Sequence, residues 1–172
     1  MADQKSEEEG MVSTKAEELL NVTRHILEEA EFCFLITRGE SEALNARLMQ
    51  PFGPDDDLTI WFGASPRSRK IREIRQDNRV TVTFEYAEEA AYATLLGEAA
   101  IKNNIEIRRR YWRESFSAFW PEGPGDDDYI LIRFSPYRIE VMDIDLGVAP
   151  EPFGLQPAIL ERHDSDWTVL TG

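Results

Sequence analysis

The 172-residue sequence contains a single cysteine, Cys33, and only two histidines, His25 and His163. One cysteine excludes an intrachain disulfide, which favours a reducing, cytoplasmic location. One thiol and two imidazoles are too few for a structural zinc site, so we predict no metal centre. Because Cys33 lies in the apolar stretch "FCFLITR" (32–38), we expect its thiol to be buried and unreactive.

Positive charge is also scarce, and no apolar run is long enough to cross a bilayer. Nineteen Lys and Arg residues stand against thirty-three Asp and Glu residues, which gives a net charge of -14. Nucleic acids and anionic membrane surfaces bind proteins through many uncompensated cations, so we expect neither as a partner. The N-terminal "MADQKSEEEGM" has no apolar core of the kind that a signal peptide needs. We therefore expect a soluble protein of the cytoplasm.

Length and composition predict one folded domain with less ordered ends. Hydrophobic residues make up 42% of the chain, and four Trp, five Tyr and nine Phe supply bulk for a core. Residues 1–12 are polar and acidic, and we expect them to be disordered. The folded domain is predicted over 13–145, and the Pro- and Gly-containing stretch 146–172 is predicted to be a C-terminal extension.

Most of this domain has the pattern of short β-strands. Apolar and alternating stretches predict strands at 32–38, 44–52, 58–64, 80–86 and 92–102, two more within 129–145 that turn at Ser135-Pro136, and a possible short strand at 166–172. Gly97 predicts a bulge or a close backbone approach. Helices are predicted from Thr14, where Glu17 completes a capping box, and over 103–120, where an Asn caps the first turn. Short strands in succession indicate a mainly β, α+β fold built as an antiparallel barrel.

The basic stretch "SPRSRKIREIRQDNRV" (65–80) is unusual in so acidic a chain, because it holds six of the nineteen Lys and Arg residues. Ser65 followed by Pro66 predicts a helix start, and we expect the helix to reach about Gln76. A helix N-terminus attracts phosphate through its free amides and its dipole. The hydroxyls and charges that would join it suit one phosphate monoester, and they come from Ser65, Ser68, Arg69, Lys70 and, on the preceding alternating strand, Arg47.

A second interpretation of the same stretch is a solvated basic helix. Its arginines would then pair with Glu73 and Asp77, and such exposed ion pairs contribute little to stability. The pattern of residues alone leaves both interpretations open.

The order of the segments resembles a known family. A strand with "NARLM" is followed by "LTIWFGA", by "SPRSRK" and by "DNRVTVTF", and "LLGEA" and "FWPEGPGDDDYILIRFSP" come later. Together, over roughly residues 14–145, they resemble the flavin-binding split-barrel proteins related to pyridoxamine 5'-phosphate oxidase, and above all the general stress protein branch. The resemblance implies a six-stranded antiparallel split β-barrel with flanking helices. It also implies a homodimer with flavin at the subunit interface.

The resemblance further implies FMN as the cofactor and places residues around it. Contacts to the FMN phosphate are implied for Arg47, Ser68, Arg69 and Lys70. Contacts to the isoalloxazine ring are implied at the strand edge of Trp61, Phe62 and Gly63, and at Leu48 and Met49. Two further flavin contacts are implied, with Trp120 reaching the flavin of the partner subunit: Tyr92 and Trp120.

The sequence departs from the family pattern where a pyridoxamine phosphate oxidase grips its substrate. Met142 stands in the place of a Trp, and the tail has no Arg-x-His pattern. Leu48 stands where a Pro is common in the general stress protein branch, which affects strand geometry more than chemistry. The first departure argues against true pyridoxamine 5'-phosphate oxidase activity.

We therefore expect an FMN-binding protein that acts as an FMN-dependent oxidoreductase on a small-molecule redox substrate. One alternative is a non-catalytic stress protein that stores or senses flavin, and another is a split-barrel reductase that binds deazaflavin F420. FAD is a further alternative to FMN. No catalytic residue is assigned, because a flavin performs the chemistry itself. Haem is disfavoured, since His25 and His163 lie outside the predicted pocket.

Overall fold

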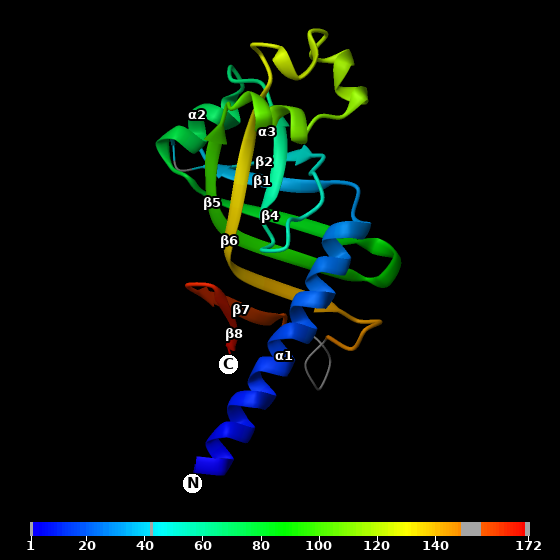
Figure 1. Ribbon diagram of the computed structural model, residues 1–172, viewed down its shortest axis with the longest axis vertical. Coiled ribbons are helices and arrows are strands. Elements are labelled where there is room, and N and C mark those ends of the chain that lie inside the picture. The colour runs from blue at the N-terminus through cyan, green and yellow to red at the C-terminus, as the bar shows by residue number, and fades with distance from the viewer. Residues whose placement is uncertain (1, 42, 149–155, 171–172) are drawn as a thin grey trace. The chain divides into compact units, whose positions relative to one another are not determined.

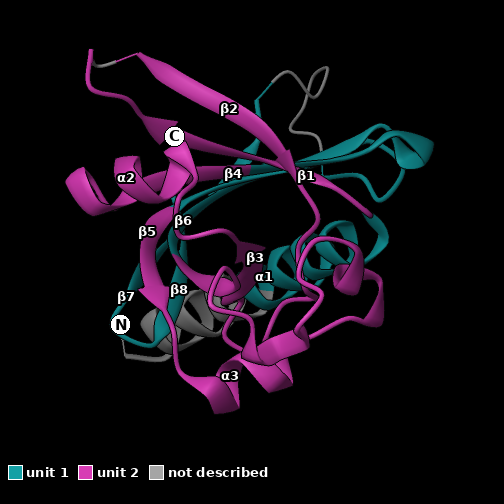
Figure 2. Ribbon diagram, turned by 90° about the horizontal axis from the view of Figure 1, so that it is seen from above, with its two compact units in different colours: residues 1–30, 83–96, 136–172 teal, residues 31–82, 97–135 magenta. Residues whose placement is uncertain are grey.

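The computed structural model describes residues 2–41, 43–148 and 156–170, with side chains from Lys15 onward. The chain consists of two compact units, which Figure 2 shows in different colours. Unit 1 comprises residues 1–30, 83–96 and 136–172, and unit 2 comprises residues 31–82 and 97–135.

The described residues form three α-helices, three short 3₁₀ segments and eight β-strands (Figure 1). The helical segments are α1 (Ala2–Glu29), α2 (Arg69–Gln76), α3 (Ile105–Arg110), η1 (Ala87–Glu89), η2 (Glu114–Ala118) and η3 (Gly123–Gly125). The strands are β1 (Cys33–Arg38), β2 (Leu44–Met49), β3 (Ile60–Ala64), β4 (Arg79–Tyr86), β5 (Ala91–Lys102), β6 (Ile130–Asp143), β7 (Ala158–His163) and β8 (Asp166–Leu170).

The strands belong to one sheet with the order β2-β1-β4-β5-β6-β7-β8, and β3 pairs with β6 outside this path. The β1–β2, β3–β6, β6–β7 and β7–β8 pairs are all antiparallel, and the sheet is not closed. The predicted mainly antiparallel α+β fold is confirmed. The sheet has eight strands instead of the six that the resemblance implied, because the C-terminal extension adds the β7–β8 hairpin.

In unit 2, one face of the β1–β2 hairpin turns inward and the other is exposed. Cys33 and Leu35 of β1 are buried, and α2 lies against this strand through the fully or almost fully buried Ile71 and Ile74. Cys33 is 2% exposed, so the predicted burial of its thiol is confirmed, and this burial raises the pKa of the thiol to about 12. Phe34, directly opposite Leu48, points to the exposed face.

Gly97 in β5 is the point of a close backbone approach, as predicted. A Cβ atom at this position would lie 2.4 Å from the carbonyl oxygen of Ser135 and 2.6 Å from the ring of Phe134. Real side chains do not approach so closely, so only glycine fits between β5 and β6 here.

The prediction of two strands turning at Ser135-Pro136 is wrong, because β6 runs without a break from Ile130 to Asp143. Pairing with β3 ends at Phe134 and pairing with β7 begins at Arg138. Pro136 therefore falls between the two paired stretches, where its missing N–H costs no bond to either of these strands.

The predicted helix over 103–120 is two shorter segments. Its Asn cap is confirmed, since the Asn104 side chain accepts hydrogen bonds from the amides of Glu106 and Ile107. However, α3 ends at Arg110, and a 3₁₀ segment follows from Glu114. The break lets the Tyr111 side chain leave the helical path and enter the core of unit 2.

In unit 1, α1 lies against β8 and buries Leu19, Ile26 and Leu27. This helix begins at Ala2, well before the predicted start at Thr14. Along it, His25 contacts Tyr86 ring to ring and bonds Glu89 over 3.2 Å. The predicted short strand at 166–172 is confirmed as β8, whereas β7 was not foreseen. The division at residues 12 and 145 stays a prediction.

Neither α1 nor any other helix in the described ranges combines the length and the apolar character that a membrane crossing requires.

Candidate phosphate site

The basic helix of unit 2 begins later than predicted. Ser65 and Pro66 belong to a turn, in which the amide of Ser68 donates to the carbonyl of Ser65 over 3.1 Å. Pro66 suits the second position of such a turn as well as a helix start, which explains the error. The helix α2 starts at Arg69, and Ser68 is its N-cap. Arg69 and Lys70 therefore lie in the first helical turn.

Arg47 of β2 reaches this helix from the neighbouring hairpin. Its Nη1 donates to the Leu35 carbonyl over 3.2 Å and to Thr37 Oγ1 over 2.6 Å, and its Nη2 donates to Glu73 Oε2 over 2.8 Å. The side chain is 18% exposed. Because β2 alternates, Arg47 shares the inner face with Asn45, which donates to Glu73 Oε1 over 2.8 Å.

Lys70 lies partly buried near Arg47 and has no carboxylate partner among the described residues. Burial and the positive charge of Arg47 lower the pKa of the Lys70 ammonium. Two cations that repel each other in a partly buried place favour an anion between them. The structure thus brings Arg47 of β2 close to Lys70 of α2.

Ser68 completes this group with an unused hydroxyl. Its Oγ is buried, makes no cap bond to the helix and has no hydrogen-bond partner among the described atoms. A buried hydroxyl without a partner costs free energy unless something bonds to it. A phosphate oxygen is a fitting acceptor, so these residues suit an FMN phosphate. Arg69 is 60% exposed, with its Nε 3.4 Å from Glu73 Oε1.

The rest of the basic stretch behaves as the solvated interpretation predicted. Arg72 and Arg75 are exposed on the outer side of α2. Arg79 pairs with Asp77 over 2.6 Å, and Arg67 pairs with Asp128. The two interpretations therefore apply to different residues of one segment.

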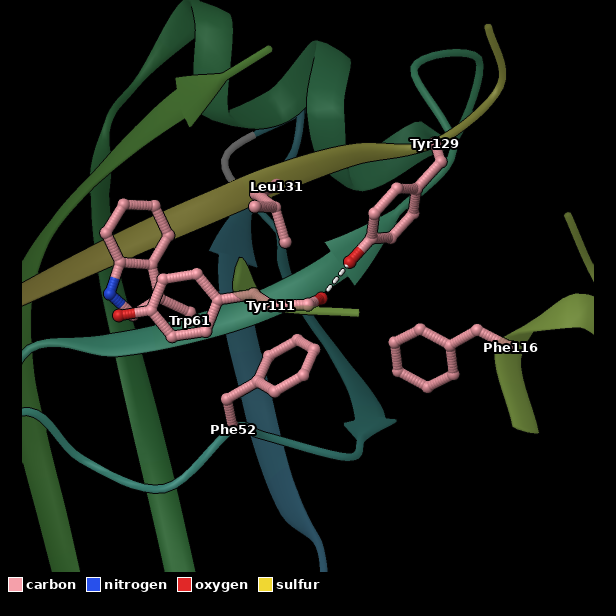
Figure 3. Packing of buried hydrophobic residues seen from close by; sticks show 6 residues of the cluster. All are labelled: Phe52, Trp61, Tyr111, Phe116, Tyr129 and Leu131. Carbon is pink, nitrogen blue, oxygen red and sulfur yellow. Dashed lines mark hydrogen bonds between the residues drawn. The ribbon is translucent and has the colours of Figure 1, made fainter. Parts of the chain in front are cut away.

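The strand implied to lie beside the flavin ring has its side chains in the core. Figure 3 shows Trp61 beside Tyr111, with ring centroids 4.6 Å apart and planes 22° apart. Trp61 is 7% exposed and Phe62 is fully buried. Any contact of Trp61 or Phe62 to a ring would therefore involve the backbone of β3.

That backbone has an open edge. The only strand that pairs with β3 in the described sheet is β6. On this edge the Trp61 carbonyl is occupied, because it accepts from the Phe52 amide over 2.9 Å, and this bond shows that the backbone of Trp61 points away from β6. By the two-residue period of a strand, the backbone of Gly63 points to the same open edge. A Cβ at Gly63 would lie 3.1 Å from the rings of Phe116 and Tyr129, so this position is also closely packed.

The other residues implied at the flavin lie in different places. Leu48 is 57% exposed on the outer face of β2, whereas Met49 is half-buried on the inner face with Arg47. Trp120 donates from Nε1 to the Asp128 carbonyl over 2.7 Å and packs on Phe116 and on Tyr129. Tyr92 is half-buried in the part of β5 that belongs to unit 1.

Sequence reasoning missed the residues that hold the cations. Glu73 was expected in exposed pairs, but it is 4% exposed and accepts from Thr37, Asn45 and Arg47. Burial alone would raise the pKa of Glu73, but the bonds from Thr37 and Arg47 and the charges of Arg47 and Arg69 outweigh it and lower the pKa. A signal was present: Thr37 and Asn45 are polar residues on the inward positions of their strands.

A cavity of about 380 Å³ lies beside this carboxylate. Its lining includes Asn45, Arg69, Glu73 and the exposed Glu40 of the β1–β2 turn. Of the four residues implied at the FMN phosphate, only Arg69 lines this cavity.

Solved structures from several bacteria share this fold. A protein related to general stress protein 26, from Clostridium acetobutylicum, aligns with a TM-score of 0.72 at 17% identity, over 87% of this chain and 99% of that chain. An FMN-binding protein related to pyridoxamine 5'-phosphate oxidase, from Nostoc punctiforme, aligns with a TM-score of 0.68 at 14% identity, over 91% and 96%. General stress protein 26 from Bacillus anthracis aligns with a TM-score of 0.63 at 21% identity, over 70% and 91%.

No curated protein matches the sequence. The model of the family described as "Pyridoxamine 5'-phosphate oxidase like" matches residues 18–150, which is most of the chain. The match includes the strand of Arg47, the basic helix and β6, and these segments carry the resemblance seen in the sequence. This chain therefore belongs to the pyridoxamine 5'-phosphate oxidase-like family.

Proposed function

We propose that this protein binds FMN and holds its phosphate between Arg47, Ser68, Arg69 and Lys70. The observation that carries the proposal is the unpartnered Ser68 Oγ at the start of α2, beside a lysine that no carboxylate neutralises among the described residues. Three positive side chains and the carboxylate of Glu73 leave two net positive charges, which match a phosphate dianion. The family and the FMN-binding protein from Nostoc punctiforme support this choice of ligand.

The charge also favours FMN over the alternatives. F420 contains a phosphodiester and FAD contains a pyrophosphate. In both cofactors each phosphorus therefore carries only one negative charge. The phosphate monoester of FMN is a dianion, so it interacts more strongly than a singly charged phosphate with an arginine, a lysine and a hydroxyl that converge on it. FMN binding is therefore the first hypothesis, and F420 and FAD serve as competitors in its test.

The isoalloxazine ring is proposed to lie against the open edge of β3. The backbone amide and carbonyl of Gly63 point to this edge, and the buried Trp61 and Phe62 behind it keep it dry. A bound flavin would supply hydride acceptance at N5. The chain would supply orientation through the phosphate group and a positive environment that favours an anionic ligand.

The protein is proposed to act as a homodimer with the flavin at the subunit interface. The exposed face of the β1–β2 hairpin supports this, because Phe34 and Leu48 are paired directly opposite each other and are 47% and 57% exposed. Leu44, on the same face, is 71% exposed. Burying such a face against a second copy removes apolar surface from water. Trp120 would then approach the partner's flavin.

Catalysis is proposed to be oxidation or reduction of a small molecule in the cytoplasm, where the lone thiol of Cys33 stays reduced. The half-buried Met142 of β6 and the missing Arg-x-His pattern also favour a second candidate, a stress protein that binds flavin without turnover. Reduction of the bound flavin by NADPH or NADH, followed by transfer to an added acceptor, separates the two. A flavin that stays oxidised with both donors supports the second candidate.

The phosphate assignment is tested by titrating the protein with FMN, riboflavin, FAD and F420. The wild type is expected to bind FMN most tightly. The double variant Arg69→Ala/Lys70→Ala should lose on the order of 2–5 kcal/mol of FMN affinity, because two charge-assisted contacts disappear. Its affinity for riboflavin, which has no phosphate, should change little. Unchanged FMN affinity in the double variant would refute the assignment.

A further inference from the structure

A buried carboxylate lies among the cations of the proposed phosphate site. Glu73 is 4% exposed and lies one helical turn after Arg69 in α2. By Coulomb's law its negative charge opposes a phosphate dianion bound nearby. A charge that weakens ligand binding in this way calls for a compensating role in the site.

We propose that Glu73 is a positioning residue that, together with Thr37, fixes the guanidinium of Arg47 in the orientation needed to grip the ligand phosphate. This inference rests on the proposed FMN function and deepens it. It assigns the phosphate specificity of the site to a residue that does not touch the ligand.

The hydrogen bonds of Arg47 show how the orientation is fixed. Thr37 Oγ1 accepts from Arg47 Nη1 over 2.6 Å and donates to Glu73 Oε2, which also accepts from Arg47 Nη2 over 2.8 Å. The three side chains thus form a closed ring of hydrogen bonds. The Leu35 carbonyl takes a further bond from Nη1. The end of this guanidinium, which comes from β2, is thus held by partners on two other elements, β1 and α2.

The donors that remain are the ones a phosphate needs. A guanidinium has five N–H groups, and the bonds to Leu35, Thr37 and Glu73 use three of them. The Nε–H and the second Nη2–H of Arg47 have no partner among the described residues. These two donors lie side by side on one edge, which is the geometry of a bidentate Arg–phosphate pair.

The second oxygen of Glu73 secures the carboxylate itself. Oε1 accepts from Asn45 Nδ2 over 2.8 Å and lies 3.4 Å from Arg69 Nε. Asn45 precedes Arg47 by two residues on the same face of β2, so the two donors grip both oxygens from one strand. Glu73 therefore cannot rotate without losing a bond at each end.

This arrangement predicts an effect opposite in sign to simple electrostatics. Removing the charge of Glu73 should strengthen the binding of an anion if charge alone mattered. If Glu73 positions Arg47, the same change should weaken FMN binding, because an amide nitrogen would face donors and release the guanidinium.

The test is a titration of the wild type, Glu73→Gln and Thr37→Val with FMN and with riboflavin. Thr37→Val opens the ring of hydrogen bonds without changing the charge, and it decides the matter if Glu73→Gln does not fold. Glu40→Gln is the charge control, because Glu40 is exposed, lines the cavity beside Glu73 and does not contact Arg47. Circular dichroism and thermal unfolding show whether each variant is folded.

We expect Glu73→Gln and Thr37→Val each to raise the Kd for FMN about tenfold or more, and the Kd for riboflavin less than about twofold. Glu40→Gln should leave FMN binding unchanged or slightly tighter. Tighter FMN binding by Glu73→Gln, or an equal loss for FMN and riboflavin, would overturn the positioning role. A wild type that binds FMN no better than riboflavin would instead overturn the proposed function, and this inference with it.

Discussion

Trp61 and Tyr111 stack with their ring centroids 4.6 Å apart, and both donate a hydrogen bond to the carboxylate of Asp55. Trp61 donates from Nε1 over 2.9 Å and Tyr111 from its hydroxyl, also over 2.9 Å. Asp55 begins the acidic run "DDD" at 55–57, a composition that is typical of a solvated turn. The structure gives it a structural role: it satisfies two polar groups of an aromatic core.

Replacing Asp55 by alanine should therefore destabilise the protein. The Trp61 and Tyr111 donors would lose their acceptor inside a cluster that is largely dry, which costs about 1–3 kcal/mol of unfolding free energy. Urea denaturation of Asp55→Ala measures this loss. Asp127→Ala, at an exposed position of the acidic run 126–128, serves as the control and should change stability by less than about 0.5 kcal/mol.

The two core tyrosines should show a late ionisation. Burial and the bond to Asp55 raise the pKa of Tyr111 to about 12, and burial raises that of Tyr129 to about 12 against the opposing charges of Arg108 and Arg113. In the folded protein these pKa values lie above the unfolded value of about 10. Their contribution to folding stability is therefore fully present below about pH 10. That contribution is lost as the pH rises to about 12.

Ultraviolet titration of tyrosinate in the wild type, Tyr111→Phe and Tyr129→Phe measures the pKa values of the two phenols directly. Each variant should lack one of the late steps. A wild type whose tyrosines all ionise together near their ordinary pKa would show that Tyr111 and Tyr129 are open to solvent.

Gly97→Ala should be among the most damaging single methyl additions to this chain. The new Cβ would meet the Ser135 carbonyl at 2.4 Å, and a backbone oxygen has little freedom to move away. We expect a loss of about 2 kcal/mol or more in thermal or urea unfolding. Gly53→Ala is the matched control, because nothing lies within 4 Å of the Cβ position there. Equal stability of the two variants would contradict the close approach of β5 and β6.

Phe34→Lys should separate the proposed dimer. Phe34 is 47% exposed and lies opposite Leu48, so the substitution costs the single chain little but places a charge in the proposed interface. Sedimentation velocity should show a dimer for the wild type and a monomer for the variant. Ile144→Lys, at a position 57% exposed and outside the hairpin, should stay dimeric. A wild type that is monomeric with flavin bound would refute the interface.

The strands could be predicted from the sequence because alternation of apolar residues is a local signal. All five strands expected before residue 103 exist, and Gly97 and the Asn104 cap were located from their own chemistry. Two errors arose where a distant contact decides the structure. Tyr111 leaves the helix because Trp61 and Asp55 bind it, and Pro136 is tolerated because β6 changes partners there.

The site follows the same rule. The proximity of Arg47 and Lys70 could be predicted from the sequence, because side chains alternate along a strand and the first turn of a helix has a defined position. The role of Glu73 could not, since one carboxylate on an exposed-looking basic helix gives no sign of being buried. Only the packing of α2 on β1 places it between Thr37, Asn45 and Arg47.

The most direct test of the account is the visible absorption spectrum of the purified protein after incubation with FMN and desalting, run beside the same experiment with riboflavin. We predict that a flavin spectrum is retained with FMN, and that riboflavin is washed away, because riboflavin lacks the phosphate that would be held by Arg47, Ser68, Arg69 and Lys70. A protein that is colourless after both treatments, or that retains both flavins equally, would contradict the phosphate site.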